Sequence, residues 1–366
     1  MKTGGEPIGR RIIAAEADSR HTALAGATVA ELRPSGWQQE LAQAVRDPLE
    51  LLALLGLEPS QIGAGETAAS LQAGALDFPL RVPRSYIARM RHGDPADPLL
   101  RQVLSTGAER LAVTGYVTDP LQEQNAREVP GLLHKYRGRA LLIATGACAV
   151  HCRYCFRRHY DYGADLDESS GARWATALQR VAQDPSLDEV ILSGGDPLSL
   201  GNSRLAQLLQ QLDDIQHLRR IRIHTRTPVV LPSRVDAGLL ALLAPLRSRL
   251  VIVIHANHPA ELDGTTATAL RQLAGHSSAM LNQSVLLAGV NDDESTLVKL
   301  STRLFEAGVL PYYLHQLDAV AGAAHYAVSD ARALALHSAM AAALPGYLLP
   351  RLVRELPGAT GKTALR

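Results

Sequence analysis

The stretch Cys148-Ala-Val-His-Cys152-Arg-Tyr-Cys155 contains all three cysteines of this 366-residue chain. Three residues separate the first two cysteines and two residues separate the last two, so three thiols lie within eight positions. A disulfide framework distributes paired cysteines along a chain, and an odd count confined to one loop does not fit it. The spacing favours three ligands of an iron–sulfur cluster, with one iron left open for another molecule, in a reducing compartment.

Two other interpretations of the cysteine loop remain open on the residues alone. Zinc prefers four ligands in structural sites, and the chain has no fourth cysteine. His151 or His159 could complete a zinc site, but ligands so close in sequence would strain a tetrahedron. Three buried structural thiols are the other alternative. The spacing favours the cluster over both.

The overall composition is that of an ordinary soluble globular protein. Hydrophobic residues make up 46% and charged residues 20% of the chain, and 37 Lys and Arg balance 36 Asp and Glu. This balance gives no reason to expect binding to nucleic acid or to an anionic membrane. No apolar run approaches the roughly 18 residues of a membrane span, and the N-terminus lacks the apolar stretch of a signal peptide. We therefore expect a cytoplasmic protein.

Residues 1–105 predict a helical extension, because apolar residues recur at three- and four-residue spacing from Trp37 onward. About the first 33 residues are rich in Ala and Gly without a period, and we expect partial disorder there. Pro48 after Asp47 predicts a helix that begins with proline. Further helices are expected over residues 66–75, 84–92 and 97–106.

From about residue 139 the pattern changes, and short β-branched runs alternate with amphipathic runs. The predicted strands are Ala140–Thr145, Val190–Ser193, Ile221–Thr225, Leu250–His255, Met280–Ala288 and Pro311–Gln316. The predicted helices cover residues 170–183, 203–213, 234–245, 259–274, 293–307 and 329–343. Such alternation is typical of βαβ units in a parallel sheet. Because eight units close a full barrel, six units predict an α/β fold with an open, three-quarter (β/α)6 TIM-like barrel over residues 106–343.

The C-terminal segment, residues 344–366, is expected to close over the mouth of this barrel. The functional face should be formed by the loops after the strands, where barrel enzymes carry their chemistry. Polar residues follow every predicted strand, which supports the strand assignment. In strand order they are the cysteine loop, Gly194-Gly195-Asp196, Arg226, His255, Asn291 and Asp318.

The cysteine loop, with Tyr154 before its third cysteine, resembles that of the radical S-adenosylmethionine superfamily. In that superfamily three cysteines hold a [4Fe-4S] cluster, the open iron binds the methionine part of S-adenosylmethionine, and reductive cleavage releases a 5′-deoxyadenosyl radical. Ser193-Gly194-Gly195-Asp196 is similar to the superfamily's GGE-type motif, with Asp in place of Glu. The resemblance implies S-adenosylmethionine contacts from Tyr154, Ser193, Gly194, Gly195, Asp196, His255 and Gln283.

Longer blocks resemble the lysine 2,3-aminomutase family from about Arg81 to the C-terminus. They are CAVHCRYCFRRH, LSGGDPL, RTPVVLPSR, NQSVLLAGVND and PYYLHQLD. The blocks RVPRSYIARM, DPLLRQVL, TDPLQEQ and VPGLLHKY are similar to the EpmB-type subgroup, which supplies β-lysine for the modification of elongation factor P.

The resemblance to this family implies a second cofactor, pyridoxal 5′-phosphate, bound covalently by Lys362. A lysine after the flexible turn Pro357-Gly-Ala-Thr-Gly361 can reach inward. Lys135 stands where the family has arginine, and it offers a point charge without the bidentate fork of arginine. Further contacts to this cofactor are implied for Tyr136, Arg139, Lys135 and Arg226.

The same resemblance implies an isomerase that converts L-lysine to β-lysine. Arg157 is implied to pair with the substrate carboxylate, and Asp318 and Glu355 with its side-chain ammonium. Glu355 is one methylene longer than the acid of the family. A flavodoxin- or ferredoxin-type donor would supply the initiating electron, and the product would pass to a ligase acting on elongation factor P. The chain lacks the additional C-terminal cysteines of the longer family members, so we expect no structural zinc and do not carry over their tetramer.

Two alternatives to this function stay open at the level of sequence. An aminomutase acting on another amino acid would share the same motifs. Asp318 and Glu355 disfavour glutamate, but they do not distinguish lysine from arginine. A non-catalytic iron–sulfur redox sensor would need neither Gly194-Gly195-Asp196 nor Lys362, so bound pyridoxal phosphate would distinguish it from an aminomutase.

Overall fold

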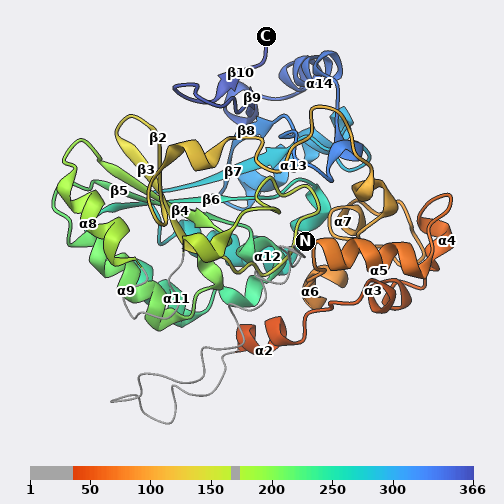
Figure 1. The fold of residues 1–366 in the computed structure, drawn as a ribbon, viewed down its shortest axis with the longest axis horizontal. Coiled ribbons are helices and arrows are strands. Elements are labelled where there is room, and N and C mark those ends of the chain that lie inside the picture. Colours follow the sequence, from red (N-terminus) through yellow and green to blue (C-terminus); the bar gives the residue numbers. More distant parts are fainter. Residues whose placement is uncertain (1–35, 166–173) are drawn as a thin grey trace, which may run out of the picture.

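The computed structural model describes residues 36–165 and 174–366. The disorder predicted near the N-terminus, and the start of the helix predicted over 170–183, lie outside the described residues. One sheet of ten strands forms the centre of the structure and follows chain order from β1 to β10 (Figure 1). Among the described residues no pairing joins β1 to β10, so the sheet stays open.

The parallel part of the sheet lies between two antiparallel edges. Strands β3 to β9 pair in parallel, β1 and β2 add an antiparallel edge before β3, and β10 adds another after β9. The strands are β1 (Arg127–Val129), β2 (Leu132–Tyr136), β3 (Arg139–Thr145), β4 (Glu189–Gly194), β5 (Arg220–Thr225), β6 (Arg249–Ile254), β7 (Ala279–Val285), β8 (Leu310–His315), β9 (Arg351–Arg354) and β10 (Thr363–Ala364).

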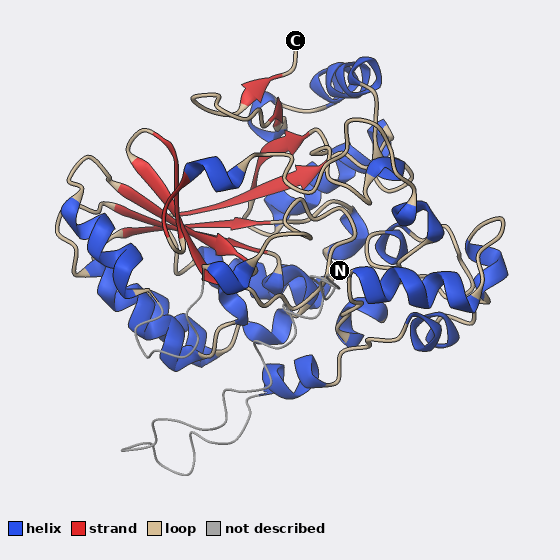
Figure 2. Ribbon diagram, in the orientation of Figure 1, coloured by secondary structure: helices blue, strands red, loops and turns tan. Residues whose placement is uncertain are grey.

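Six strand–helix units confirm the predicted open (β/α)6 barrel. Strands β3 to β8 correspond to the six predicted strands, and a helix follows each of them before the next strand. Figure 2 shows the helices outside the fan of strands. They are α8 (Ala175–Gln183), α9 (Asn202–Asp213), α11 (Ala237–Leu243), α12 (Gly264–Ala274), α13 (Glu294–Glu306) and α14 (Asp330–Ala343), with the single turn α10 (Thr227–Val230) before α11.

Alternating side chains of β5 show how the barrel separates its apolar layer from its polar interior. Successive residues of a strand point to opposite faces of the sheet. Ile221 and Ile223 are fully buried in the core between the sheet and the surrounding helices. Arg222 and His224 line a cavity on the inner face. The interior of this open barrel is therefore polar along the length of the strand, and not only at its carboxyl end.

The C-terminal segment extends the sheet, a feature that was not predicted from the sequence. Strand β9 pairs in parallel with β8 and adds a seventh parallel strand, and β10 folds back antiparallel onto β9. Leu352 and Val353 of β9 are buried. The loop between β9 and β10 contains Lys362, whose side chain lines the cavity.

The N-terminal extension contains several short helices and packs against the cysteine loop. Its helices are α2 (Gly36–Ala42), α3 (Pro48–Leu54), α4 (Pro59–Ile62), α5 (Ala68–Asp77), α6 (Arg84–Ile87) and α7 (Pro98–Arg101). The helices predicted over residues 84–92 and 97–106 are single turns in the structure. Asp47 caps α3 by accepting a hydrogen bond from the backbone of Leu49 at 2.9 Å, and Pro48 starts the helix. The apolar core of the extension includes Ala149 and Val150 of the cysteine loop. We propose residue 105 as the boundary between extension and barrel, and residue 344 as the start of the C-terminal segment.

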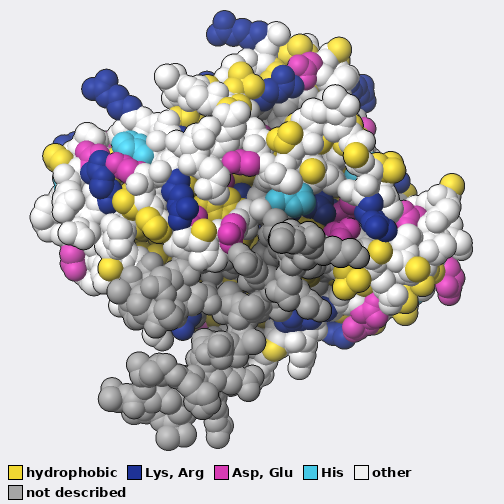
Figure 3. Space-filling view, in the orientation of Figure 1, with side chains coloured by type: hydrophobic (Ala, Val, Ile, Leu, Met, Phe, Trp, Pro, Cys, Tyr) yellow, Lys and Arg dark blue, Asp and Glu magenta, His cyan; other side chains and the backbone are white. Residues whose placement is uncertain are grey.

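The surface on the face shown in Figure 3 mixes acidic and basic side chains with apolar ones. No block of one charge dominates the described residues visible there. None of the helices in the described part of the chain is both long and apolar enough to cross a bilayer.

Candidate active site

One cavity inside the barrel brings together every site residue predicted from the sequence. It is lined from the inner faces of the strands, the loops at their carboxyl ends, and the loop before β10. The predicted residues that line it are Lys135, Tyr136, Arg139, Cys148, Cys152, Tyr154, Cys155, Arg157, Ser193, Gly194, Gly195, Asp196, Arg226, His255, Gln283, Asp318, Glu355 and Lys362.

The three cysteines lie in the loop after β3 as half-buried free thiols. Burial raises the pKa of the Cys148 thiol, and burial with the nearby Cys152 raises the pKa of Cys155 to about 11. Among the described residues, no three His, Cys, Asp or Glu side chains converge on a site for a single metal ion. Three thiols that line one cavity, in a chain without a fourth cysteine, fit a [4Fe-4S] cluster better than the four-ligand sites of structural zinc.

Gly194 and Gly195 allow the end of β4 to approach the cysteine loop closely. Gly194 has φ +102°, a conformation that side chains rarely adopt. A Cβ atom on Gly195 would lie 2.4 Å from the carbonyl oxygen of Ala147, and the Gly195 amide donates to the Thr145 carbonyl at 2.7 Å. The double glycine is therefore required by the packing of two backbones at the cavity wall.

Asp196 links the ends of β4 and β5 with a buried carboxylate. Its two oxygens accept four hydrogen bonds of 2.6–3.0 Å, from the Thr225 hydroxyl and from the backbone amides of Leu198, Arg226 and Thr227. Because these donors occupy both oxygens, the structure favours a positioning role for this carboxylate. The backbone of Gly194 and Gly195 is the part of the motif that remains close to a ligand in the cavity.

Tyr154 and His255, both implied to contact S-adenosylmethionine, line the same cavity. The Tyr154 hydroxyl accepts a hydrogen bond from Asn257 Nδ2 at 2.6 Å. Burial lowers the pKa of His255 to about 4, so its imidazole is neutral at physiological pH. His255 Nε2 is buried without a partner among the described residues. A neutral ring with an open nitrogen suits a hydrogen bond to a bound molecule.

A chain of alternating charges crosses the cavity from Arg157 to Lys362. Glu123 accepts two hydrogen bonds from Arg157, from Nε at 2.6 Å and from Nη2 at 2.8 Å. Lys135 Nζ lies 2.8 Å from Glu123 and 3.2 Å from Glu355, and Glu355 also pairs with the ammonium of Lys362. Burial opposes ionisation of Glu123, but Arg157 and Lys135 outweigh it and lower its pKa to about 2. Glu355 is therefore already paired with an alkylammonium group.

Lys362 and Asp318 are half-buried groups of opposite charge, and each influences the ionisation of the other. Burial lowers the pKa of Lys362 to about 8, against the opposing effect of Asp318. Burial raises the pKa of Asp318 to about 6, against the opposing effect of Lys362. The chain has four lysines, and two of them, Lys135 and Lys362, line this cavity. Lys362 thus combines a cavity position with an amine that is partly unprotonated near neutral pH.

Tyr136 and Arg139 flank the tight turn between β2 and β3. Gly138 in this turn has φ +76°, as two-residue hairpin loops require. The guanidinium of Arg139 lies over the Tyr136 ring, 4.7 Å from its centroid. No carboxylate among the described residues lies within ion-pair distance of Arg139. A cavity arginine without an acidic partner is suited to a phosphate group, which fits the predicted contact to pyridoxal phosphate.

Two of the predicted phosphate contacts have other partners in the structure. Lys135 lies between two carboxylates, as described above. The Arg226 guanidinium donates to Cys152 Sγ at 2.7 Å and also to Glu261 and Gln102. Because these bonds direct Arg226 toward the cysteine loop, the structure does not favour the phosphate contact implied for it by resemblance.

Several cavity residues were not predicted from the sequence. Glu123 lies in the block TDPLQEQ, whose similarity to the family was the available signal. His224 and His315 line the cavity, and the Nε2 atom of each is buried without a partner among the described residues. Burial lowers the pKa of both rings well below the ordinary value, so both are neutral hydrogen-bonding groups. The sequence indicated only weakly that these two histidines belong to the site, because histidines in strands more often belong to a core.

The lowered pKa of Lys362 predicts how the attachment of pyridoxal phosphate depends on pH. The unprotonated amine is the reactive form. The attachment rate of the apoprotein should rise about tenfold per pH unit below pH 8 and become constant above it. Stopped-flow measurement of the visible absorbance of the bound cofactor tests this. A rate that keeps rising up to the ordinary lysine pKa of 10.5 would contradict the burial effect.

Comparisons with known proteins extend these observations beyond the cavity. Residues 137–227 match the protein family described as a 4Fe-4S single cluster domain. The L-lysine 2,3-aminomutase of Escherichia coli (strain K12) is 48% identical over 330 residues, which cover 90% of this chain and 94% of that protein. The L-lysine 2,3-aminomutase of Haemophilus influenzae is 45% identical over 329 residues, 89% of this chain and 94% of that protein. The crystal structure of a radical SAM methyltransferase from Sphaerobacter thermophilus is 19% identical with a TM-score of 0.43, over 61% of this chain and 68% of that one.

Proposed function

The chain belongs to the L-lysine 2,3-aminomutase family, and from this membership we propose that it converts L-lysine to β-lysine by moving the amino group from C2 to C3. One observation carries the proposal. A single cavity contains the three cysteines, Lys362, a cationic Arg157 and the acids Asp318 and Glu355. These groups are the ones that a radical rearrangement of a cationic amino acid requires.

The cavity residues fit the three cofactors of this family. Cys148, Cys152 and Cys155 would hold a [4Fe-4S] cluster, whose free iron binds S-adenosylmethionine. Lys362 would hold pyridoxal 5′-phosphate, with Arg139 suited to its phosphate. When bound, the cluster and S-adenosylmethionine supply a carbon radical, and pyridoxal phosphate supplies a π-system that delocalises the radical during amino migration.

Charges in the cavity support lysine as the substrate. We assign Arg157 to the α-carboxylate through Nη1, because Glu123 occupies Nε and Nη2 and a charged hydrogen bond from arginine to a carboxylate is strong. Glu123 fixes the orientation of Arg157 by a two-point ion pair. Asp318 and Glu355 present two acids to the side-chain ammonium, and they would repel the side-chain carboxylate of glutamate.

Asp318→Asn should weaken lysine binding more than it slows the chemical step. The substitution keeps the size of the side chain and removes the charge that faces the ammonium. We expect the KM for lysine to rise roughly 10- to 100-fold, because a hydrogen bond to a charged group contributes about 1.5–3 kcal/mol. The kcat should change much less. Steady-state kinetics with lysine and with arginine measure the effect, and an unchanged KM for lysine would refute the assignment.

The substrate proposal is tested by parallel reactions of the reconstituted enzyme. Anaerobic protein with S-adenosylmethionine and a reductant is supplied separately with lysine, arginine or glutamate, and amino-acid analysis identifies the products. We expect β-lysine from lysine and no 3-amino product from glutamate. Faster turnover of arginine than of lysine would overturn the assignment of lysine.

We also propose an electron donor, a fate for the product and a location for the enzyme. A flavodoxin- or ferredoxin-type protein would deliver the electron that reduces the cluster. The similarity of the TDPLQEQ and VPGLLHKY blocks supports a subgroup whose β-lysine is transferred to elongation factor P by a ligase. Cytoplasm is the proposed location, because three cysteines reserved for a cluster require a reducing compartment.

A further inference from the structure

We propose that Arg226 is a positioning residue for the iron–sulfur cluster. Arg226 holds the sulfur of Cys152 by a charged hydrogen bond and thereby raises the reduction potential of the cluster. The inference rests on the proposed function in one respect, the assignment of the three cysteines as cluster ligands. It does not depend on the identity of the amino-acid substrate.

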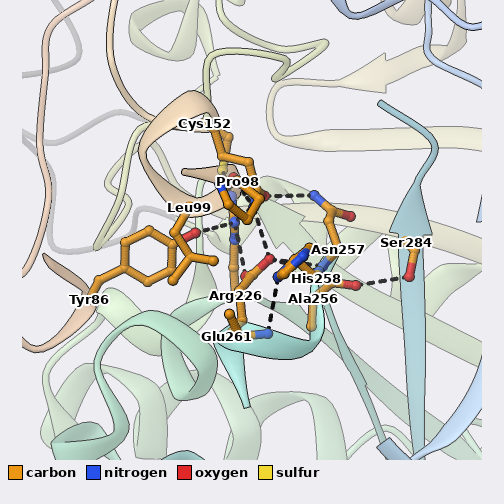
Figure 4. A network of polar contacts seen from close by, with 12 residues as sticks. Tyr86, Pro98, Leu99, Cys152, Arg226, Ala256, Asn257, His258, Glu261 and Ser284 are labelled. Carbon is orange, nitrogen blue, oxygen red and sulfur yellow. Dashed lines mark hydrogen bonds and ion pairs between the residues drawn. The ribbon is translucent and has the colours of Figure 1, made fainter. Parts of the chain in front are cut away.

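The hydrogen bond joins the end of β5 to the middle of the cysteine loop. Arg226 follows β5, and its side chain is buried. Nη1 of Arg226 lies 2.7 Å from Cys152 Sγ. Figure 4 shows Arg226 in the middle of this network, with Cys152 above it and Tyr86 to its left. Of the predicted ligands, Cys152 is thus the one with a cation directly at its sulfur.

The other terminal nitrogen of Arg226 is fixed by three acceptors. Nη2 donates to Gln102 Oε1 at 2.7 Å, to Glu261 Oε2 at 3.1 Å and to the Tyr86 hydroxyl at 3.3 Å. These bonds leave the guanidinium little freedom to rotate away from Cys152. The direction of the Nη1 hydrogen bond is therefore set by the protein and not by the sulfur alone.

Glu261 is itself held in place, so that the buried charge pair is rigid. Its side chain is fully buried. Its second oxygen accepts hydrogen bonds from the backbone amides of Asn257 and His258 and from Gln102 Nε2, at 3.0–3.1 Å. A buried ion pair whose remaining atoms are hydrogen-bonded keeps one geometry. Arg226 consequently presents a fixed positive charge to the cluster side of the cavity.

A fixed cation at a ligand sulfur changes the redox equilibrium of a cluster. Reduction adds one electron from an external reductant and makes the cluster more negative. Hydrogen bonds to cluster sulfurs and nearby positive charge stabilise the reduced form and raise the potential. Arginine is suited to this role because its guanidinium stays charged at all physiological pH values. Arg226 should therefore make the first electron transfer easier.

The same network explains why the N-terminal extension packs on the cysteine loop. Tyr86 belongs to α6, and Gln102 directly follows α7. Both side chains contact Arg226. The extension thus contributes side chains to the surroundings of the cysteine loop.

The test is a redox titration of the reconstituted protein without lysine, followed by electron paramagnetic resonance of the reduced cluster. In Arg226→Gln we expect the ratio of reduced to oxidised cluster at a fixed potential to fall about tenfold, which corresponds to a midpoint lower by about 59 mV for one electron. Arg222→Gln is the matched control. It removes a positive charge that lines the same cavity and pairs with Glu189, and its midpoint should stay at the wild-type value.

A midpoint in Arg226→Gln equal to that of the wild type, with an intact cluster, would overturn the proposal. A second measurement needs no variant. Electron–nuclear double resonance of wild-type protein with isotope-labelled arginine should detect a guanidinium nitrogen coupled to the reduced cluster, and the absence of such coupling would also overturn it. A wild-type protein that binds no cluster would refute the assignment of the cysteines, and the proposed function with it. A cluster with an unchanged midpoint would refute only the role of Arg226.

Discussion

Replacement of Lys362 by alanine is expected to abolish β-lysine formation while leaving the iron–sulfur cluster in place. We expect kcat to fall by roughly three to four orders of magnitude, the scale at which loss of a covalent catalytic group acts. Burial lowers the pKa of Lys362 to about 8, which makes its amine available for covalent attachment. The other cavity lysine, Lys135, directs its ammonium to Glu123 and Glu355. It is not placed to substitute for Lys362.

Lys362→Arg is the matched control for this prediction. Arginine keeps a positive charge opposite Glu355 but cannot attach pyridoxal phosphate. Both variants should fold, because Glu355 retains Lys135 and Tyr136 as hydrogen-bond donors. After borohydride reduction, mass spectrometry should find the cofactor on the wild-type peptide and on neither variant, with equal iron content in all three proteins. Full turnover by Lys362→Ala would refute the covalent role.

Removal of one cysteine should eliminate the cluster and all turnover. In Cys155→Ala we expect iron to fall from about four atoms per chain to well below one. The chain contains no further cysteine that could replace the lost ligand. Because burial raises the pKa of Cys155 to about 11, cluster assembly must displace a tightly held proton. A loop with only two thiols has too few ligands to offset that cost. Iron and sulfide analysis with electron paramagnetic resonance measures the loss.

His151→Asn is the control that separates a cluster from zinc. His151 lies in the cysteine loop, but its Nδ1 bonds to the Pro79 carbonyl oxygen at 2.8 Å, and its ring is not among the groups that line the cavity. Asparagine keeps a donor near the position of Nδ1. The variant should retain iron and turnover. A protein that contains zinc and loses it in His151→Asn would contradict the cluster assignment.

The parallel sheet could be predicted because its strands carry local signals. The sequence of β5, Arg220–Thr225, alternates polar and apolar residues, and β4 carries the apolar run Val190–Leu192. The prediction for β7 extended three residues too far, because it included Leu286 and Leu287. Both side chains are fully buried, but they belong to the loop after the strand. The apolar character of Leu286 and Leu287 therefore predicted their burial correctly, but it did not predict where the strand pairing ends.

Elements that depend on distant partners could not be predicted. Strand β9, Arg351–Arg354, has only four residues and becomes a strand by pairing with the edge of β8. Glu123 gives no signal of burial in its polar surroundings, and its partner Arg157 is 34 positions away in the sequence. The partners of Arg226 come from both the extension and the barrel. Such contacts are properties of the folded chain, and residue spacing does not encode them.

In the proposed reaction, one cavity uses a cluster-derived radical and Lys362-bound pyridoxal phosphate to move the amino group of lysine. The most direct measurement supplies reconstituted, anaerobic enzyme with S-adenosylmethionine, a reductant and L-lysine whose α-nitrogen is isotopically labelled. Mass spectrometry then locates the label in the product. We predict β-lysine that carries the label on C3. The absence of β-lysine from protein that contains both cluster and pyridoxal phosphate, or β-lysine without the label, would contradict the account.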